Sequence, residues 1–116
     1  MMLLPAGTKV HLALGHTDMR KGIDGLATMV QEVLREDSFS GHLFAFRGRN
    51  ARIIKILFWD GSGLVMAYKP LEETAFIWPA IRDGVMTLNR AQFEALFAGL
   101  DWRRVRSLDA RRPAAA

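Results

Sequence analysis

Residues 52–59 (RIIKILFW) constrain the fold more than any other segment of this chain. Successive side chains of a β-strand point to opposite faces of the sheet, and here both faces are mostly apolar. The two faces would be Ile54, Ile56 and Phe58 on one side, and Ile53, Lys55, Leu57 and Trp59 on the other. A strand that is apolar on both sides is typical of a sheet covered on both faces. The segment therefore predicts a central strand with a packing layer on each side of it.

Turn-forming residues on each side of this segment predict antiparallel neighbours. Residues 47–51 (RGRNA) contain Gly and Asn, which tolerate positive φ, and would join it to a strand over 42–46. Residues 60–63 (DGSG) are the strongest turn signal in the chain and would lead into a returning strand over 64–69. Pro70 has no backbone N–H, so it ends this strand or confines it to an edge of the sheet.

The N-terminal part of the chain predicts one strand followed by one helix. Apolar and polar residues alternate over residues 9–14, which indicates a short half-buried strand. Apolar residues then recur at helical spacing over 19–35, and residues 17–18 (TD) offer N-cap oxygens. Gly22 and Gly25 lie inside this predicted helix, where they weaken its first turn or admit a neighbouring backbone.

The C-terminal part predicts short strands and a second helix. Residues 75–78 are strand-like and stop at a proline, and residues 85–88 are a further short strand candidate. Residues 89–92 (NRAQ) have the spacing of a capping box, which predicts a helix over about 90–98. Gly99 is a natural C-terminal stop for that helix.

The predicted order of elements is β-α-β-β-β-β-α. This order predicts an α+β fold: an antiparallel sheet of about four to five strands with both helices packed on it. A length of 116 residues suits one domain, which we place over residues 1–105. Residues 106–116 lack periodicity and are rich in Arg and Ala, so a flexible basic tail is predicted there.

Composition excludes several classes of protein. The chain has no cysteine, which rules out a disulfide scaffold, a cysteine nucleophile and a thiolate metal site. No stretch is long and apolar enough to cross a bilayer. Residues 1–4 lack a basic flank and precede Pro5, so they do not predict a signal peptide. We therefore expect a soluble, cytoplasmic protein with no membrane partner.

The polar residues do not form a recognisable catalytic or metal-binding pattern. A two-metal nuclease needs converging carboxylates, whereas the carboxylates here suit caps, turns and a polar helix face. The histidines fall in different predicted elements, and the DGSG turn lacks the residue order of a nucleophile elbow. The residues considered are Asp18, Asp24, Asp60, Asp83, His11, His16, His42 and Ser62. The sequence predicts a protein that is not an enzyme and uses no metal, cofactor or small-molecule substrate.

Positive charge is concentrated in two segments, although the formal net charge is only +4. Residues 38–59 contain four basic residues and no acidic one, and residues 101–116 contain five arginines against two aspartates. A basic two-stranded ribbon fits the major groove of DNA, so the first segment predicts nucleic-acid contact. The alternative is a solvated turn beside core aromatics. The candidate nucleic-acid-binding residues are Arg47, Arg49, Arg52, Lys55, Arg20, Lys21, Arg103 and Arg104.

An apolar segment suggests a second kind of function. Residues 76–79 (FIWP) could furnish a patch for another protein or for a second copy of the chain. Phe76 and Trp78 are the candidate interaction residues. The alternative is that these aromatic side chains belong to the core.

Five ordered blocks of the sequence resemble one protein family. They are residues 17–26 (TDMRKGIDGL), 42–49 (HLFAFRGR), 54–64 (IKILFWDGSGL), 76–79 (FIWP) and 99–103 (GLDWR). These blocks are similar to the small accessory protein from the second open reading frame of insertion-sequence family sixty-six, often called TnpB or Orf2-like. The resemblance extends from about Leu4 to Arg104. It does not concern the RNA-guided nuclease that shares the TnpB name.

The resemblance implies a bacterial mobile-element protein that assists DNA transposition. A separate, larger protein that resembles a DDE-type transposase would carry the catalysis. The expected partners are element DNA, the transposase, or both, and the alternative is a protein-interaction module, homodimeric or transposase-binding, without direct DNA contact. The family supplies no catalytic residues to carry over. Its recurring residues, which are candidates only, are Asp18, Arg20, Lys21, Arg47, Lys55, Asp60 and Trp78.

One position departs from the family pattern. Where the family commonly has Lys-Arg-Leu-Glu, this chain has Lys-Pro-Leu-Glu at residues 69–72. A basic side chain and a backbone N–H are lost at Pro70, which argues against a phosphate contact at that point. The strand over 64–69 is expected to end earlier for the same reason.

Overall fold

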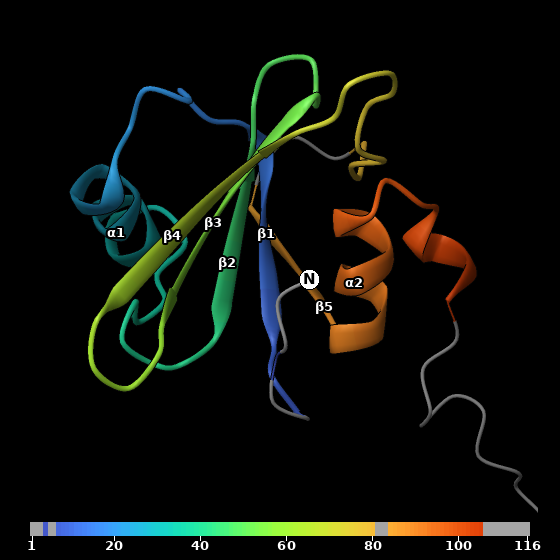
Figure 1. Cartoon of the computed structure of the whole chain (residues 1–116). Helices are drawn as coiled ribbons and strands as arrows, with labels where there is room; N and C mark the ends of the chain where they lie inside the picture. Colours follow the sequence, from blue (N-terminus) through green and yellow to red (C-terminus); the bar gives the residue numbers. More distant parts are fainter. Residues whose placement is uncertain (1–3, 5–6, 81–83, 106–116) are drawn as a thin grey trace, which may run out of the picture.

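The computed structural model describes residues 4, 7–80 and 84–105, and these contain five strands, two α-helices and one 3-10 helix. In chain order (Figure 1) they are β1 (Val10–His16), α1 (Ile23–Glu32), β2 (Leu43–Arg47), β3 (Ile53–Trp59), β4 (Leu64–Pro70), β5 (Val85–Leu88), α2 (Arg90–Phe97) and the 3-10 helix η1 (Trp102–Arg104). The predicted tail over 106–116 lies outside the described residues. Its flexibility and the domain boundary at 105 therefore stay predictions.

The strands form one sheet in the order β4-β3-β2-β1-β5. β3 lies inside the sheet, between β4 and β2, as its two apolar faces predict. The β2–β3, β3–β4 and β1–β5 pairs are antiparallel, whereas β1 and β2 are parallel. The α+β fold is confirmed, with a sheet that is mostly antiparallel. The parallel pair follows from α1, because parallel neighbours need a crossover connection and a helix supplies it.

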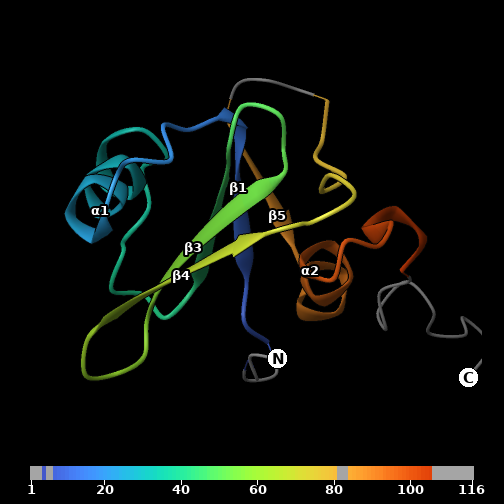
Figure 2. The ribbon, with the colours of Figure 1, turned by 45° about the horizontal axis from the view of Figure 1, so that its top comes forward.

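The two helices cover opposite faces of the sheet, as Figure 1 and Figure 2 show. On one face, Leu26 and Val30 of α1 join a buried cluster with Leu57 of β3. On the other face, Phe93 of α2 joins a second buried cluster with Ile54 of β3. The alternation of side chains along β3 therefore supplies both cores, because each side chain points to the face opposite its neighbour's.

The helix α1 is shorter at both ends than the predicted helix over 19–35. Its N-cap is Gly22, which is extended and has no side chain to accept a hydrogen bond. Asp18 does not cap the helix, because its carboxylate accepts the backbone N–H and the guanidinium of Arg20 instead. At the other end, Arg35 has a φ of 57°, which lies outside the helical region. The residues between β1 and α1 consequently form a loop.

Residues 75–78 are not a strand, contrary to the prediction. Three consecutive side chains of this segment pack against the same buried cluster, whereas a strand would alternate them between two faces. Two hydrogen bonds to distant parts of the chain hold this segment in place. The backbone N–H of Phe76 donates to the Ala51 carbonyl (2.7 Å), and the indole N–H of Trp78 donates to the Ala13 carbonyl (3.1 Å).

Most of the remaining local predictions are confirmed, but the expectation that the strand over 64–69 ends early is wrong. β4 is an edge strand and runs to Pro70 itself, so it does not end before the proline. Asn89 and Gln92 form both hydrogen bonds of the capping box that opens α2. Gly99 follows α2 with a φ of +81°, a conformation that favours glycine. In the part of the chain that the structure describes, no helix has the length and apolar character needed to span a bilayer.

Candidate nucleic-acid interface

One end of the sheet gathers several chain segments. The carboxyl ends of β1 and β2 meet there because these strands are parallel, and the β2–β3 turn lies at the same end (Figure 1). The backbone N–H of Thr17 donates to the Arg47 carbonyl at 2.8 Å, which keeps the chain leaving β1 beside the end of β2. Turn residues 48–52 and the loop before α1 are therefore neighbours, although they are far apart in the sequence.

Two contacts hold the loop before α1 against the turn. The ammonium of Lys55, on β3, donates to the backbone carbonyl of Lys21 at 2.8 Å. Gly48 is buried, and a Cβ atom added there would lie 3.1 Å from the Cγ atom of Met19. The absence of a side chain at Gly48 thus permits close packing of the loop. The two segments together present five cations, which we call the basic tip: Arg20, Lys21, Arg47, Arg49 and Arg52.

Lys55 is not part of this surface, although the sequence made it a candidate. The residue is only 7% exposed, on the α1 face of β3, and its ammonium also lies 5.9 Å from the centre of the Tyr68 ring. Its charge is directed at the Lys21 carbonyl rather than at solvent. Lys55 therefore positions Lys21 and does not itself present a cation to a ligand.

The predicted ribbon in the major groove does not fit this sheet. β2 pairs with β1 as well as with β3, and β3 pairs with β4, so the hairpin is embedded on both sides. Both faces of the hairpin are also covered by buried clusters. Only its turn is free to meet a nucleic acid, and Arg49 and Arg52 are the exposed cations on that turn.

Arg47 is half-buried and organises the turn from inside. Its Nη1 atom donates to the backbone carbonyls of Gly48 (3.1 Å) and Arg49 (3.0 Å). Its Nε atom is buried and has no hydrogen-bond partner among the described residues. A buried donor without an acceptor costs free energy, so the Arg47 guanidinium is incompletely paired within the described residues.

Arg20 presents its charge next to a compensating carboxylate. Its guanidinium donates to both carboxylate oxygens of Asp18, over distances of 2.8 to 3.2 Å. These hydrogen bonds hold the pKa of Asp18 well below its usual range. The Arg20 side chain is still 91% exposed, so it can reach a phosphate at the surface. Lys21 beside it is also exposed.

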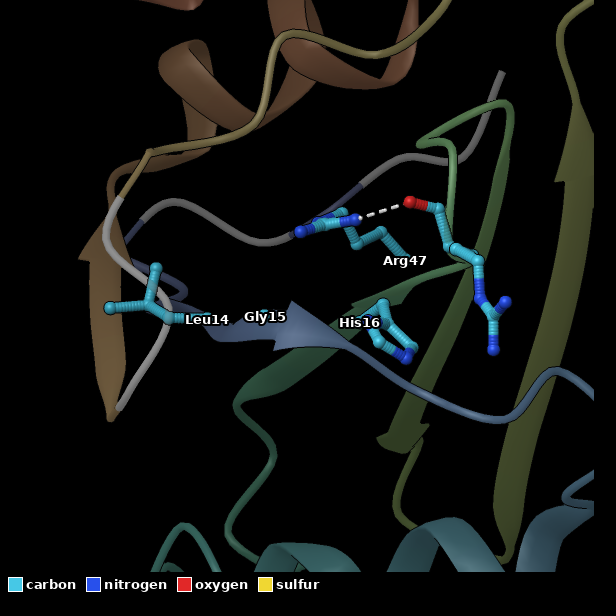
Figure 3. Close-up of a pocket in the computed structure, with 5 residues that line it drawn as sticks. Leu14, Gly15, His16 and Arg47 are labelled. Carbon is cyan, nitrogen blue, oxygen red and sulfur yellow. Dashed lines mark hydrogen bonds between the residues drawn. The ribbon is translucent and has the colours of Figure 1, made fainter.

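A pocket of about 470 Å³ lies at the carboxyl ends of β1 and β2 (Figure 3). It is lined by Leu14, Gly15, His16, Arg47 and Arg49, and we call it the β1–β2 pocket. The pairing of β1 with β2 is irregular between Leu12 and His16, and Gly15 has a φ of +82° at that irregularity. This pocket was not predicted from the sequence. The one sequence signal for a site here is His16, which follows the predicted first strand. That signal leads to Arg47 only when β1 and β2 are known to be parallel, because the parallel pairing makes the two residues neighbours.

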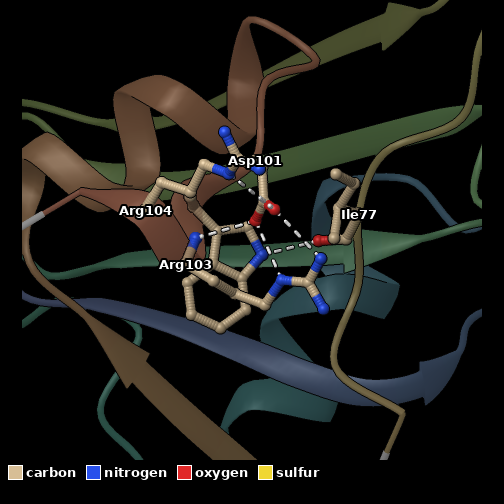
Figure 4. A network of polar contacts seen from close by, with 5 residues as sticks. Ile77, Asp101, Arg103 and Arg104 are labelled. Carbon is tan, nitrogen blue, oxygen red and sulfur yellow. Dashed lines mark hydrogen bonds and ion pairs between the residues drawn. The ribbon is translucent and has the colours of Figure 1, made fainter.

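Arg103 and Arg104 do not join the basic tip. They lie in η1, on the α2 side of the sheet and away from the β2–β3 turn in both Figure 1 and Figure 2. The Asp101 carboxylate accepts two hydrogen bonds from the Arg103 guanidinium, at 2.8 and 3.0 Å, and lies 3.9 Å from the Arg104 guanidinium (Figure 4). The hydrogen bonds from Arg103 lower the pKa of Asp101. The Asp101 carboxylate therefore partly neutralises the charge of these two arginines.

The candidate protein-interaction residues pack inward, Phe76 within the core and Trp78 against its edge. Phe76 is only 3% exposed, and Trp78 is half-buried against the α2-side cluster. They do not form a surface patch, because both side chains pack inward. The alternative that the sequence analysis kept open, that they are core residues, is the one the structure supports.

Several of the remaining polar candidates have structural partners, whereas Asp83 lies outside the described residues. The Asp60 carboxylate accepts the N–H groups of Ser62 and Gly63, which closes the turn and lowers its pKa. His11 and His42 contact each other, with 2.9 Å between Nε2 and Nδ1. Over residues 4, 7–80 and 84–105, no three His, Asp or Glu side chains gather closely enough to hold a metal ion.

The fold and the site define a small α+β protein in which a group of five cations gathers at one end of a mixed sheet. Residues 8–107 match the family described as IS66 Orf2 like protein, and the chain belongs to that family. The family was expected from the sequence blocks, and this match confirms it.

Two relatives come from Sinorhizobium fredii (strain NBRC 101917 / NGR234). The protein named "Uncharacterized protein y4hO" is 42% identical over 103 residues, which covers 87% of this chain and 90% of that protein. The protein named "Uncharacterized protein y4jC" is 36% identical over 107 residues, which covers 92% of each chain. No solved structure matches this chain.

Proposed function

We propose that this protein assists the transposition of a bacterial insertion sequence by contacting DNA of the element through the basic tip. The observation that supports this most directly is the convergence of cations from residues 20–21 and 47–52 at one end of the sheet. The net charge is only +4, so this concentration is not a simple result of composition. Membership of the IS66 Orf2-like family supports the transposition context.

The proposed contact is mainly electrostatic. Exposed arginine and lysine side chains bind DNA phosphates and release counterions, which makes such binding strongly dependent on salt. Arg49 and Arg52 would reach the backbone from the turn, and Lys21 from the loop beside it. Phosphate contacts position a protein on DNA, whereas base contacts specify a sequence. The transposase would catalyse the reactions on the DNA, and this chain would act without catalytic residues. Both proteins would work in the cytoplasm of the bacterium.

A titration with matched variants tests this proposal. The protein is titrated onto labelled terminal-repeat DNA and onto scrambled DNA of the same length at about 50 and 200 mM salt. The double variant Arg49→Ala/Arg52→Ala should bind more weakly, with a salt slope smaller by about two phosphate contacts. Arg103→Ala/Arg104→Ala removes the same charge away from the tip and should bind as the wild type does. Equal weakening by both pairs would mean that charge alone, not the tip, governs binding.

Contact with the transposase or with a second copy of the chain is a second candidate function. β4 is an edge strand, its outer side is unpaired within the described residues, and Tyr68 on it is 53% exposed. A partner strand can add to such an edge through main-chain hydrogen bonds. Light scattering over a range of concentrations and a pull-down with the purified transposase test this function. A monomer that retains no transposase would contradict it.

A further inference from the structure

We infer that the β1–β2 pocket binds a phosphate monoester, carried at the end of a DNA strand. This inference rests on the proposed function, because it assigns one group of the DNA to one place beneath the basic tip. The exposed cations of the tip would hold phosphates along the strand, and the pocket would receive its terminal phosphate. The donors, the charge and the size of the pocket support this assignment.

The Arg47 guanidinium is fixed and incompletely paired. Its Nη1 atom is held by two backbone carbonyls of the turn, at 3.1 and 3.0 Å, so the group cannot swing freely into solvent. Its Nε atom is buried with no acceptor among the described residues. A planar guanidinium matches the oxygens of a phosphate, and a preorganised donor loses little entropy on binding. A phosphate in the pocket would therefore meet the terminal N–H groups of this held guanidinium rather than the enclosed Nε.

The charge of the pocket favours an anion. None of its five lining residues is acidic, and two of them, Arg47 and Arg49, are arginines. His16 and Arg47 are register partners in the parallel pair β1–β2, so these two lining residues are neighbours across the strand pair. A phosphate monoester carries a charge of about −1.5 to −2 near neutral pH. Two arginines and a histidine suit this charge better than the single charge of an internal phosphodiester.

The size of the pocket favours a strand end. Its volume of about 470 Å³ is near the lower limit of ordinary small-ligand sites, roughly 300–1,000 Å³. A pocket of this size accepts a group on the scale of one nucleotide, whereas a duplex backbone would touch only its mouth. Gly15 contributes no side chain to the wall, and its φ of +82° disfavours any replacement that would.

Direct binding of end-modified oligonucleotides tests the inference. One single-stranded sequence is prepared with a 5′-phosphate, with a 3′-phosphate or with hydroxyl groups at both ends, and with the dye placed internally. The full-length wild-type protein should prefer one phosphorylated form over the hydroxyl-ended form by about tenfold, the effect of one charge-assisted hydrogen bond. Adenosine 5′-monophosphate should compete for that preference, and adenosine should not.

Variants at exposed positions link this preference to the pocket. Arg47 is half-buried, and its replacement could disturb the fold, so His16→Ala and Arg49→Ala are the informative changes. Both should bring the phosphate preference close to one while their circular dichroism stays that of the wild type. Arg52→Ala is the matched control, because Arg52 is exposed on the tip but does not line the pocket. This change should weaken the binding of all three oligonucleotides equally and leave the preference for the phosphorylated form unchanged.

The outcomes separate this inference from the proposed function. Equal binding of all three oligonucleotides, weakened by Arg52→Ala, would overturn the strand-end pocket and leave DNA binding by the tip standing. A preference that survives both His16→Ala and Arg49→Ala would place the phosphate elsewhere and would also overturn the inference. Binding of adenosine 5′-monophosphate without binding of any oligonucleotide would assign the pocket to a free nucleotide. That result would overturn both the strand-end inference and the proposed function.

Discussion

Replacement of Lys55 by methionine separates a structural lysine from a DNA-binding one. Lys55 is 7% exposed, and its ammonium donates to the Lys21 carbonyl across 2.8 Å. Methionine keeps most of the length and apolar volume of the side chain, so the packing beside Leu57 should change little. The change therefore removes one charge and one hydrogen bond with little other disturbance.

The expected loss of stability follows from two opposing terms. A hydrogen bond to a charged group contributes about 1.5–3 kcal/mol. Burial of the ammonium costs part of that free energy, because an ion taken from water loses solvation. We expect Lys55→Met to lower the free energy of unfolding by about 1–2 kcal/mol, after the partial offset. For a domain of this size, that corresponds to a fall of roughly 4–12 °C in Tm.

Urea unfolding, monitored by tryptophan fluorescence, measures the change in stability. A DNA titration measures whether the affinity for DNA also changes. Lys9→Met is the matched control, because Lys9 is exposed and the same charge is lost. Lys55→Met should unfold at lower urea with an unchanged m-value, whereas Lys9→Met should not. Under conditions where Lys55→Met is fully folded, its affinity for DNA should fall far less than that of Arg49→Ala/Arg52→Ala, because only the backbone position of Lys21 is loosened. Wild-type stability combined with an affinity as low as that of Arg49→Ala/Arg52→Ala would refute the reasoning.

Three further changes test other parts of the structure. Asn89→Ala removes the capping box of α2 and should cost about 1 kcal/mol by urea unfolding, whereas exposed Ala91→Ser should cost less. Trp102→Phe removes the 2.6 Å hydrogen bond from the indole to the Ile77 carbonyl and should cost about 1–3 kcal/mol by the same measurement. Burial lowers the pKa of His11, with Glu36 opposing and His42 adding to this effect, so the unfolded chain binds more protons and stability falls with falling pH. Urea midpoints between about pH 7 and pH 5 should show a smaller fall in His11→Phe than in the wild type, and an equal fall would contradict this origin.

Local patterns predicted the elements whose causes are local. The capping box at Asn89 and Gln92 and the stop at Gly99 involve residues that are close in the sequence, and all were found. β3 was predicted at the centre of the sheet because its own alternation requires two covered faces. The helix α1 was predicted too long for an equally local reason. The Asp18 oxygens bond Arg20 within the loop, and this competes with capping.

Long-range contacts decided the features that the sequence did not predict. Lys55 was assigned to DNA because it is basic, yet its alternation in β3 already placed it on the same face as Leu57. The partner that makes burial of its ammonium tolerable, the Lys21 carbonyl, is more than thirty residues away. Residues 75–78 looked like a strand from composition alone. Their packing as a loop depends on Ala51 and Ala13, which no local pattern reveals.

The parallel pairing of β1 with β2 is the feature on which the candidate site depends. The crossover through α1 brings the end of β1, with His16, to the same end of the sheet as Arg47. An antiparallel pairing of the same two strands would have put their carboxyl ends at opposite ends of the sheet. The loop after β1 would then carry Arg20 and Lys21 away from the turn that holds Arg49 and Arg52. The basic tip and the β1–β2 pocket thus have one origin, and a modest net charge becomes a local concentration of cations because of strand direction.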